Sequence, residues 1–391
     1  MDQNKTFDDL QSTLAAKGPA VAIDRLCTTL REQKDYGNLF YALLLKKRHE
    51  LGVSPVPTGR SDDLPQSVHA DYEEAIRQAG RLVGRLYLDE GNIPQAWAYF
   101  RMLGEPEPVA QALDKYQAGE NDDCQAIVEI AYHHGVNPRK GFDVILERFG
   151  ICSAITTMGG HLGGPQTEQP PEVREYCIKR LVRALHDQLL ERLQAEIERR
   201  EGQVPATKSI RQLLAGRDWL FEDGFYHIDV SHLGSVVQMS MHLPPCEELE
   251  LARDLCAYGE RLSPQFQYAG DPPFENQYKD YGVYLATLAG VHVEDGIAYF
   301  RAKAENADPE TIGTFPAEVL VNLLLRINRP AEALDVARKH LAKVEDRQLT
   351  CPAIPEICQR VKDYRTLAEV ARERGDPVNF MAGLIAAGSA C

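Results

Sequence analysis

Residues 82–108 read LVGRLYLDEGNIPQAWAYFRMLGEPEP, and this stretch decides the fold. Apolar residues recur at the three- and four-residue spacing of a helix on both sides of a short polar turn, Asp89-Glu90-Gly91-Asn92. Glycine and asparagine favour such tight turns, and the surrounding spacing suits helices of about a dozen residues. The stretch therefore predicts two helices that fold back on each other.

Small, aromatic and proline residues follow a recurring pattern within this helix pair, and in that pattern the stretch resembles one tetratricopeptide repeat. The resemblance implies that small side chains at Gly84 and Ala96 let two antiparallel helices approach closely. It also implies that Tyr87 and Phe100 fill the space above and below that contact. The positions that carry the resemblance are Val83-Gly84, Tyr87, Ala96, Phe100 and Pro108.

The rest of the chain repeats the helical spacing, and nowhere does it show the alternating Val/Ile/Thr runs of a sheet. Weaker echoes of the pair cover residues 284–306, with Gly296 and Phe300, and residues 321–345, with Ala333 and Ala337. A single helix pair cannot bury its apolar face alone, so neighbouring pairs must stack. We therefore expect an all-α fold, an α-solenoid of antiparallel tetratricopeptide-like helix pairs, interrupted by a non-repeat segment near 201–232.

Breaks in this pattern predict the domain organisation. Residues 1–160 are expected to form N-terminal helical repeats, and the glycines and prolines of residues 161–171 a linker. Residues 172–235 are expected to hold a long helix followed by an irregular segment, and residues 236–391 the C-terminal helical repeats. The irregular part is longer than most connections between helices, which makes it the first place to look for function.

The long helix over 172–200 carries an apolar stripe on one face. Such a stripe favours burial in the core of the same chain, and a homodimer through this helix is the alternative. The residues of the stripe are Ile178, Val182, Leu185, Leu189, Leu193 and Ile197.

Charge and hydropathy narrow the class of partner. The formal net charge of the 391 residues is -15, which disfavours nucleic acid and anionic lipid as partners. The basic run Lys46-Lys47-Arg48 lies within a helical pattern and is expected to face solvent. No stretch approaches the roughly 18 consecutive apolar residues of a membrane span. We therefore expect neither nucleic acid nor membrane binding.

The N-terminal residues and the cysteines predict a location. Met1 to Thr6 lack the basic start and apolar run of a secretory signal. The nine cysteines are an odd number, and none forms a C-x-x-C pair. We expect reduced thiols and a cytoplasmic protein.

The most suggestive polar cluster is His227-Ile228-Asp229-Val230-Ser231-His232, within the irregular segment. If His227, Asp229 and His232 converge at the start of the following helix, two imidazoles and a carboxylate would suit a divalent metal such as zinc. The alternative is that Asp229 caps that helix and the histidines form local hydrogen bonds.

Four further residues are candidates for a site. Tyr226 directly precedes the cluster. His133 and His134 close a helix, where an imidazole near the last carbonyls is favourable for capping. His161 lies in the glycine-rich stretch and would be the base for a thiolate at Cys152, although no recognisable catalytic motif surrounds them.

Aromatic residues gather between Phe266 and Tyr284, where the spacing of Phe274, Tyr278 and Tyr281 favours core packing.

Two functions fit these patterns. The first is a scaffold of the helical-repeat type that binds a protein or peptide segment, an inference that rests on the fold. The second is an enzyme whose helical scaffold encloses a pocket around Tyr226 to His232, with or without metal, although it lacks a second acid, base or nucleophile at a known spacing.

Overall fold

The computed structural model describes residues 3–58, 64–119, 122–162, 169–308 and 310–389. Within these ranges the chain is predominantly helical and forms no β-strand, and extended backbone pairs only in an isolated bridge between Ala269 and Asn276. Consecutive helices pack against each other along the chain. The expected all-α class is confirmed, and the packing of neighbours is compatible with a helical repeat.

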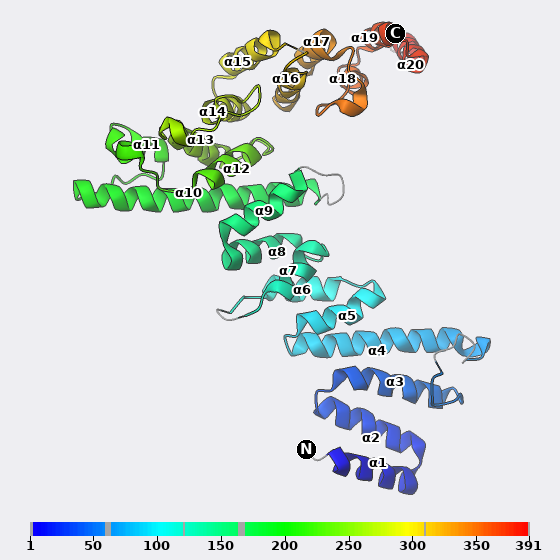
Figure 1. Ribbon diagram of the computed structural model, residues 1–391. Helices are drawn as coiled ribbons and strands as arrows, with labels where there is room; N and C mark the ends of the chain where they lie inside the picture. The colour runs from blue at the N-terminus through cyan, green and yellow to red at the C-terminus, as the bar shows by residue number, and fades with distance from the viewer. Residues whose placement is uncertain (1–2, 59–63, 120–121, 163–168, 309, 390–391) are drawn as a thin grey trace. The chain divides into compact units, whose positions relative to one another are not determined.

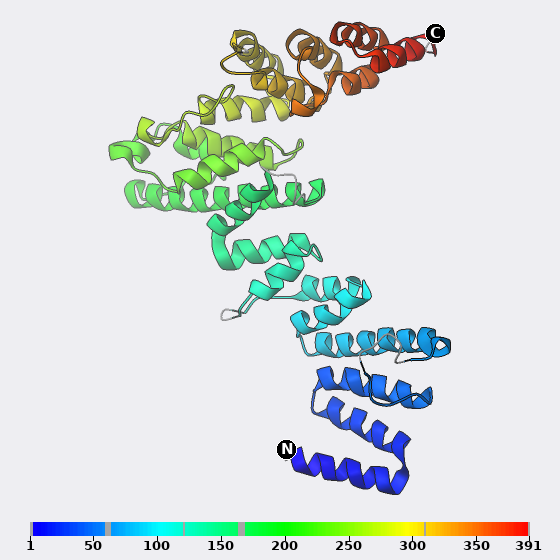
Figure 2. The same ribbon diagram turned by 45° about the vertical axis from the view of Figure 1, so that its right-hand side comes forward.

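The chain divides into two compact units, residues 1–150 and 151–391. In the first unit α1 to α4 lie beside one another in chain order (Figure 1, Figure 2). Its helices are α1 (Gln3–Lys17), α2 (Pro19–Glu32), α3 (Tyr36–Glu50), α4 (His69–Asp89), α5 (Ile93–Leu103), α6 (Glu107–Lys115), α7 (Gln125–Val128) and α8 (Pro138–Val144), with the short turns η1 (Gln66–Val68), η2 (Glu129–His133) and η3 (Ile145–Phe149).

The quoted stretch forms the end of α4, a turn and α5. Asn92 caps α5 because its side chain accepts a hydrogen bond from the backbone N–H of Gln95 at 3.2 Å. Gly104 ends the helix with a φ of 70°, a left-handed conformation that glycine adopts without strain. The Phe100 ring lies so close to Gly84 that a Cβ atom there would be 2.7 Å from the ring. The small residue is therefore needed where α4 meets α5.

Tyr87 connects two parts of the core in the first unit. Its ring meets Tyr36 of α3 edge to face at 5.1 Å between centroids and stacks on Tyr99 of α5 at 5.9 Å. It packs both against the cluster around Leu39 and Val83 and against the cluster around Phe100. One aromatic side chain thus joins α3, α4 and α5.

The second unit continues the packing of consecutive helices after a long helix, α10. The short helix α11 and three 3-10 helices interrupt the series. Its elements are α9 (Gly150–Leu162, which begins at the boundary), α10 (Pro171–Glu201), α11 (Ile210–Leu214), η4 (Asp218–Gly224), α12 (Val230–Ser240), α13 (Glu248–Gly259), η5 (Pro264–Phe266), α14 (Gln277–Leu288), α15 (Val293–Asn306), α16 (Phe315–Arg326), α17 (Pro330–Leu341), η6 (Asp346–Gln348), α18 (Ile354–Val361), α19 (Tyr364–Arg374) and α20 (Pro377–Ser389).

The apolar stripe of α10 is buried within its own chain. All six residues from Ile178 to Ile197 that define it are at most 2% exposed, and α12 and α13 pack on this helix (Figure 1). The alternative of a homodimer through the stripe gains no support, because α12 and α13 already cover these apolar residues.

Aromatic side chains fill the core around α14, as their spacing predicts. The ring of Phe274, which precedes α14, stacks on Tyr281 with centroids 4.1 Å apart. Tyr284 meets Phe300 of α15 edge to face at 5.6 Å. In the same helix pair a Cβ atom on Gly296 would clash with the Thr287 hydroxyl, which repeats the tight contact seen at Gly84.

None of the described helices combines the length and apolar character needed to cross a membrane. Among the described residues eight cysteines are present as free thiols. Of the expected linker over 161–171, residues 163–168 lie outside the described residues, and α9 extends as far as Leu162.

Replacing Ala96 tests the packing of α4 on α5. Ala96 is fully buried, so Ala96→Leu is expected to overpack the contact and lower the free energy of unfolding by ~1–3 kcal/mol. Ala98 on the same helix is exposed, and Ala98→Leu should leave stability within about 0.5 kcal/mol. Urea unfolding of both variants checks this, and equal stability of the two would contradict the packing described.

Candidate functional site

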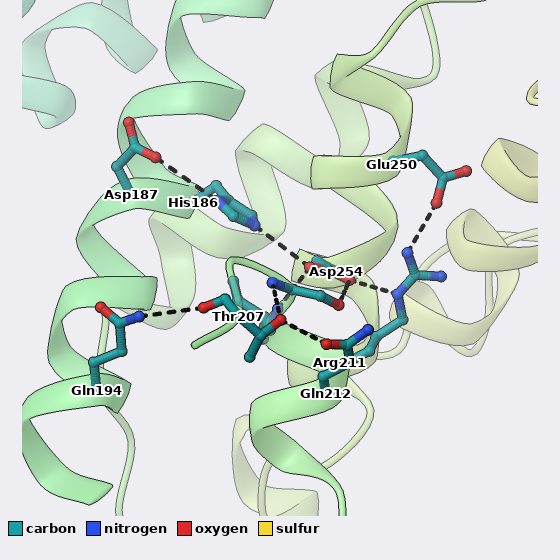
Figure 3. Close-up of polar contacts among 10 residues, drawn as sticks. His186, Asp187, Gln194, Thr207, Arg211, Gln212, Glu250 and Asp254 are labelled. Atoms are coloured by element: carbon teal, nitrogen blue, oxygen red, sulfur yellow. Dashed lines mark hydrogen bonds and ion pairs between the residues drawn. The ribbon is translucent and has the colours of Figure 1, made fainter. Parts of the chain in front are cut away.

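A buried carboxylate anchors the irregular segment that follows α10. Asp254 of α13 is 3% exposed. Its Oδ2 accepts a hydrogen bond from the backbone N–H of Ile210 at 2.7 Å, and its Oδ1 accepts one from Nε of Arg211. The Arg211 guanidinium also donates to Glu250 at 2.8 Å (Figure 3). The start of α11 is thereby fixed to α13.

Asp254 also contacts α10, through His186 Nε2 at 3.5 Å. A second set of hydrogen bonds lies beside this contact: Thr207 donates to Gln212 at 2.6 Å, and Gln194 of α10 donates to the Thr207 carbonyl at 3.3 Å (Figure 3). The irregular segment is therefore tied to two helices at once.

The hydrogen bonds of Asp254 serve to hold α10, α11 and α13 together, and we call this network the structural clamp. Burial alone would raise the pKa of Asp254, but hydrogen bonds from His186 and Arg211 hold the pKa of this carboxyl below its ordinary value. The Ser209 hydroxyl contacts Asp254 at 3.5 Å and not His186, whereas nucleophilic catalysis needs the hydroxyl on the imidazole. The carboxylate is ionised and its hydrogen-bonding capacity is used by the fold.

His227 is the most buried of the residues predicted to bind metal. It is 6% exposed, its backbone N–H donates to the Tyr258 hydroxyl at 2.7 Å, and its Nδ1 lies 3.2 Å from the same oxygen. Arg192 of α10 donates to its carbonyl at 2.6 Å. Burial, together with the charge of Arg192, lowers the pKa of His227 to about 4. The imidazole is neutral at pH 7 and belongs to the packing.

Asp229 caps α12. Its carboxylate accepts hydrogen bonds from the backbone N–H of Ser231 at 2.8 Å and of His232 at 3.1 Å, and from the Ser231 hydroxyl. The pKa of Asp229 is lowered, and the hydrogen bond from the Ser231 hydroxyl contributes most to this shift. His232 is half-buried on the first turn of the helix. The Asp229 carboxylate therefore caps α12, as the alternative to metal binding predicted.

In the part of the chain that the structure describes, no three His, Cys, Asp or Glu side chains form a group that could hold a metal ion. His227 faces Tyr258 and Asp229 faces the α12 backbone. The hypothesis of zinc at His227, Asp229 and His232 therefore gains no support from the arrangement, nor does the enzyme hypothesis in its metal form.

Two of the remaining sequence candidates, His133 and His134, lie in the first unit. His134 accepts a hydrogen bond at Nδ1 from the Trp97 indole at 3.1 Å, and its Nε2 lies 3.5 Å from Glu129. His133 meets the edge of Tyr132 at 5.4 Å between centroids. His161 belongs to α9, and its side chain lies outside the described residues.

Tyr226 contacts an aromatic residue of a second irregular segment. Its ring packs edge to face against Phe266 at 5.0 Å. Phe225 is 55% exposed, Tyr226 46% and Tyr268 63%, while Phe266 is half-buried. Phe225 and Tyr268 are close to this pair in sequence, and we call the four residues Phe225, Tyr226, Phe266 and Tyr268 the aromatic surface.

A glycine with a left-handed backbone conformation precedes the first of the two segments. Gly224 has a φ of 72°, and a Cβ atom there would lie 3.1 Å from the Gln265 side chain. Asp223 beside it also has a positive φ, of 56°. Sequence reasoning assigned Phe266 and Tyr268 to the same series as the core aromatics. The signal that could have separated them is their position between Ser263-Pro264 and Gly270-Asp271, outside any helical spacing.

Comparison with protein-family models, with curated proteins and with solved structures finds no match to this chain. What the molecule is can be stated from its fold: an all-α protein of successively packed helices. What it does has to be argued from its own residues.

The burial of His227 predicts a pH dependence. The pKa of this imidazole is about 4 in the folded state and 6.5 without the fold, so the unfolded chain binds the extra proton between these values. The contribution of the neutral, buried His227 to the free energy of unfolding is complete above pH 6.5. It is lost as the pH falls toward 4. We expect the free energy of unfolding to drop by about 2 kcal/mol more between pH 7.5 and pH 5 in the wild type than in His227→Gln. Equal drops in urea titrations would contradict this.

Three single variants separate capping from metal binding. If Asp229 acts as a cap, Asp229→Ala lowers the free energy of unfolding by ~1 kcal/mol and His232→Ala changes it much less. Metal analysis of the purified wild type and of His227→Ala and His232→Ala is the second measurement. A stoichiometric metal that both histidine variants lose would restore the metal hypothesis.

Proposed function

We propose that this chain is a tetratricopeptide-like helical array that binds a protein or peptide segment. Its support is the repeated use of a small residue where successive helices meet. Gly84 lies under Phe100, Gly296 lies under Thr287, and Ala333 of α17 is fully buried. These positions are those that the resemblance to tetratricopeptide repeats singles out.

The observation that carries the binding proposal is the aromatic surface. Tyr and Phe side chains supply large contact area at small cost in conformational entropy, and they are enriched at interfaces with other proteins. Three of them here are about half exposed or more, on neighbouring segments, in a chain whose other aromatic residues include many that are fully buried. Exposed aromatic residues on two adjoining segments support an interaction site there.

The surroundings of the aromatic surface favour a basic partner. Glu222 and Asp223 are exposed, with only Gly224 between them and Phe225. The Glu222 carboxylate pairs with the Arg200 guanidinium at 3.5 Å, so Asp223 is the main local attraction for a basic partner. The chain as a whole carries a net charge of -15. A segment with Lys or Arg beside apolar residues would be attracted by the carboxylates and would cover the rings.

The backbone under the aromatic surface is held in place before any partner arrives. His227, next to Tyr226, is fixed by Tyr258 and by Arg192, and Phe225 meets the His227 ring at 5.1 Å. The Asp254 network fixes the start of the same segment. A prearranged surface loses less entropy on binding than a mobile loop does.

Selection of peptides tests the proposal. Random peptides displayed on phage are selected on the purified full chain, and we expect convergent sequences that combine basic and apolar residues. Synthetic versions should bind Tyr226→Ala and Tyr268→Ala at least tenfold more weakly than the wild type, the loss typical of aromatic residues at the centre of an interface.

Tyr41→Ala is the matched control, because Tyr41 is 69% exposed on α3, in the first unit. Its affinity for the selected peptides should equal that of the wild type. Selection without convergence, or the same loss in all three variants, would count against the aromatic surface as the binding site.

A further inference from the structure

A pocket in the first unit is lined by the end of α5, the start of α6 and the turn that follows η2. Its volume is about 360 Å³, at the small end of the range of about 300–1,000 Å³ in which ligand pockets fall. It combines an apolar wall with charged side chains, as sites for small molecules do. The lining residues that matter here are Trp97, Arg101, Glu105, Glu107, His134 and Val136.

The apolar wall of the pocket is held in one orientation. The Trp97 indole N–H donates to His134 Nδ1 at 3.1 Å, and His134 Nε2 lies 3.5 Å from the Glu129 carboxylate. Trp97 and Val136 are partly buried and pack on the core cluster around Phe100. A ligand that packs on the indole therefore does not have to order it first, which lowers the entropy cost of binding.

The charged side chains of the pocket differ in whether the protein pairs them. Glu105 accepts two parallel hydrogen bonds from the Arg81 guanidinium, at 2.7 and 3.1 Å, and these bonds lower the pKa of its carboxyl. Within the described residues, the side chains of Arg101 and Glu107 form no ion pair or hydrogen bond, either with each other or with a third group. One unpaired cation and one unpaired anion thus line a single pocket.

These two charges select the class of ligand. A single unpaired charge on a protein surface is ordinary, because water solvates it. A ligand that fills the pocket displaces that water, so a ligand with one charge would leave either Arg101 or Glu107 desolvated without a partner. A ligand that carries both signs of charge pairs with both residues.

Electrostatics at longer range favours the same class. The net charge of -15 repels a simple anion from the whole chain, and the Arg101 guanidinium repels a simple cation within the pocket. A zwitterion has no net charge and avoids both penalties. The apolar wall adds that part of this zwitterion is apolar.

We propose that this pocket binds a free α-amino acid with an apolar side chain. The Arg101 guanidinium pairs with the α-carboxylate, for which its parallel N–H donors are suited. The Glu107 carboxylate pairs with the α-ammonium group, and the apolar side chain packs on Trp97. Glu105 disfavours an acidic side chain. This site is separate from the aromatic surface, which belongs to the second unit.

Fluorescence of Trp97 tests binding directly. The chain has two tryptophans, Trp97 and Trp219, so Trp219→Phe leaves the pocket indole as the only one. In this full-length variant we expect a saturable change of emission on titration with L-phenylalanine or L-leucine, and weaker binding of L-glutamate. Calorimetric titration of the wild type with L-phenylalanine should give the same dissociation constant. Absence of saturable binding of both apolar amino acids overturns the proposal.

Blocked ligands show whether both charges are needed. N-acetyl-L-phenylalanine lacks the ammonium group, and L-phenylalanine amide lacks the carboxylate. Each should bind at least tenfold more weakly than L-phenylalanine, because each leaves one charge of the pocket without a partner. Equal binding of the acetylated form would define an anion site and equal binding of the amide a cation site, and either result overturns the proposal.

Variants assign each charge to its partner. Arg101→Gln and Glu107→Gln should each weaken binding of L-phenylalanine at least tenfold. In Arg101→Gln the amide should bind as well as the free amino acid, and in Glu107→Gln the acetylated form should do so, because the group that each lacks has lost its partner. Arg31→Gln and Glu32→Gln are the matched controls, since both residues are exposed on α2, outside the pocket, and both variants should bind like the wild type.

Circular dichroism checks that all variants are folded. Unchanged affinity in Arg101→Gln or Glu107→Gln, or an equal loss in the two controls, overturns the proposal.

Discussion

Contact between successive helices at positions with no room for a larger side chain is the constraint on which this structure depends. Phe100 packs on Gly84, Thr287 on Gly296, and the α19 backbone on Gly383. At each place the helices approach closely enough that even a methyl group would collide with its neighbour. Dispersion and apolar burial stabilise the pair only at that distance, so the small residue determines which faces of the two helices meet.

The segment between α10 and α12 departs from this rule and is held by polar contacts. Burying a carboxylate is unfavourable unless the charge is paired. Asp254 is stabilised by the Arg211 guanidinium, the His186 imidazole and the backbone N–H of Ile210. These partners come from α10 and from the start of α11. Together with buried apolar side chains of the segment, such as Leu213 and Leu220, these contacts fix the segment that carries the exposed aromatic rings at its far end.

Some of this could be predicted from the sequence, and the reason lies in the range of the interactions. The turn at Gly91-Asn92 is local, so the sequence indicated it. The resemblance to a tetratricopeptide repeat implied a close approach of the two helices at Gly84, but it placed Ala96 there and not Phe100, whose ring the structure sets against Gly84. The burial of the apolar stripe of α10 could be predicted from its periodicity. The helices that cover it, α12 and α13, could not. Asp254 finds its side-chain partners 43 and 68 residues away, at Arg211 and His186, and no local pattern predicts such a pairing.

The candidate site illustrates the same limit. The cap at Asp229 is a local feature, and a cap was one of the two alternatives that the sequence left open. Burial of His227 against Tyr258 depends on a residue 31 positions later. The aromatic surface needs Tyr226 and Phe266 to meet across 40 residues, which became visible only when both loops were placed.

The Asp254 network also implies that two parts of the second unit differ in how easily they unfold locally. Helices α10, α11 and α13 share one buried carboxylate, so none of them can leave without exposing the charges of the others. From α15 to α20, by contrast, each helix contacts chiefly its neighbours along the chain. Amide hydrogens of that part should exchange with solvent through partial openings, while those of α10 and α13 exchange only when the whole block unfolds.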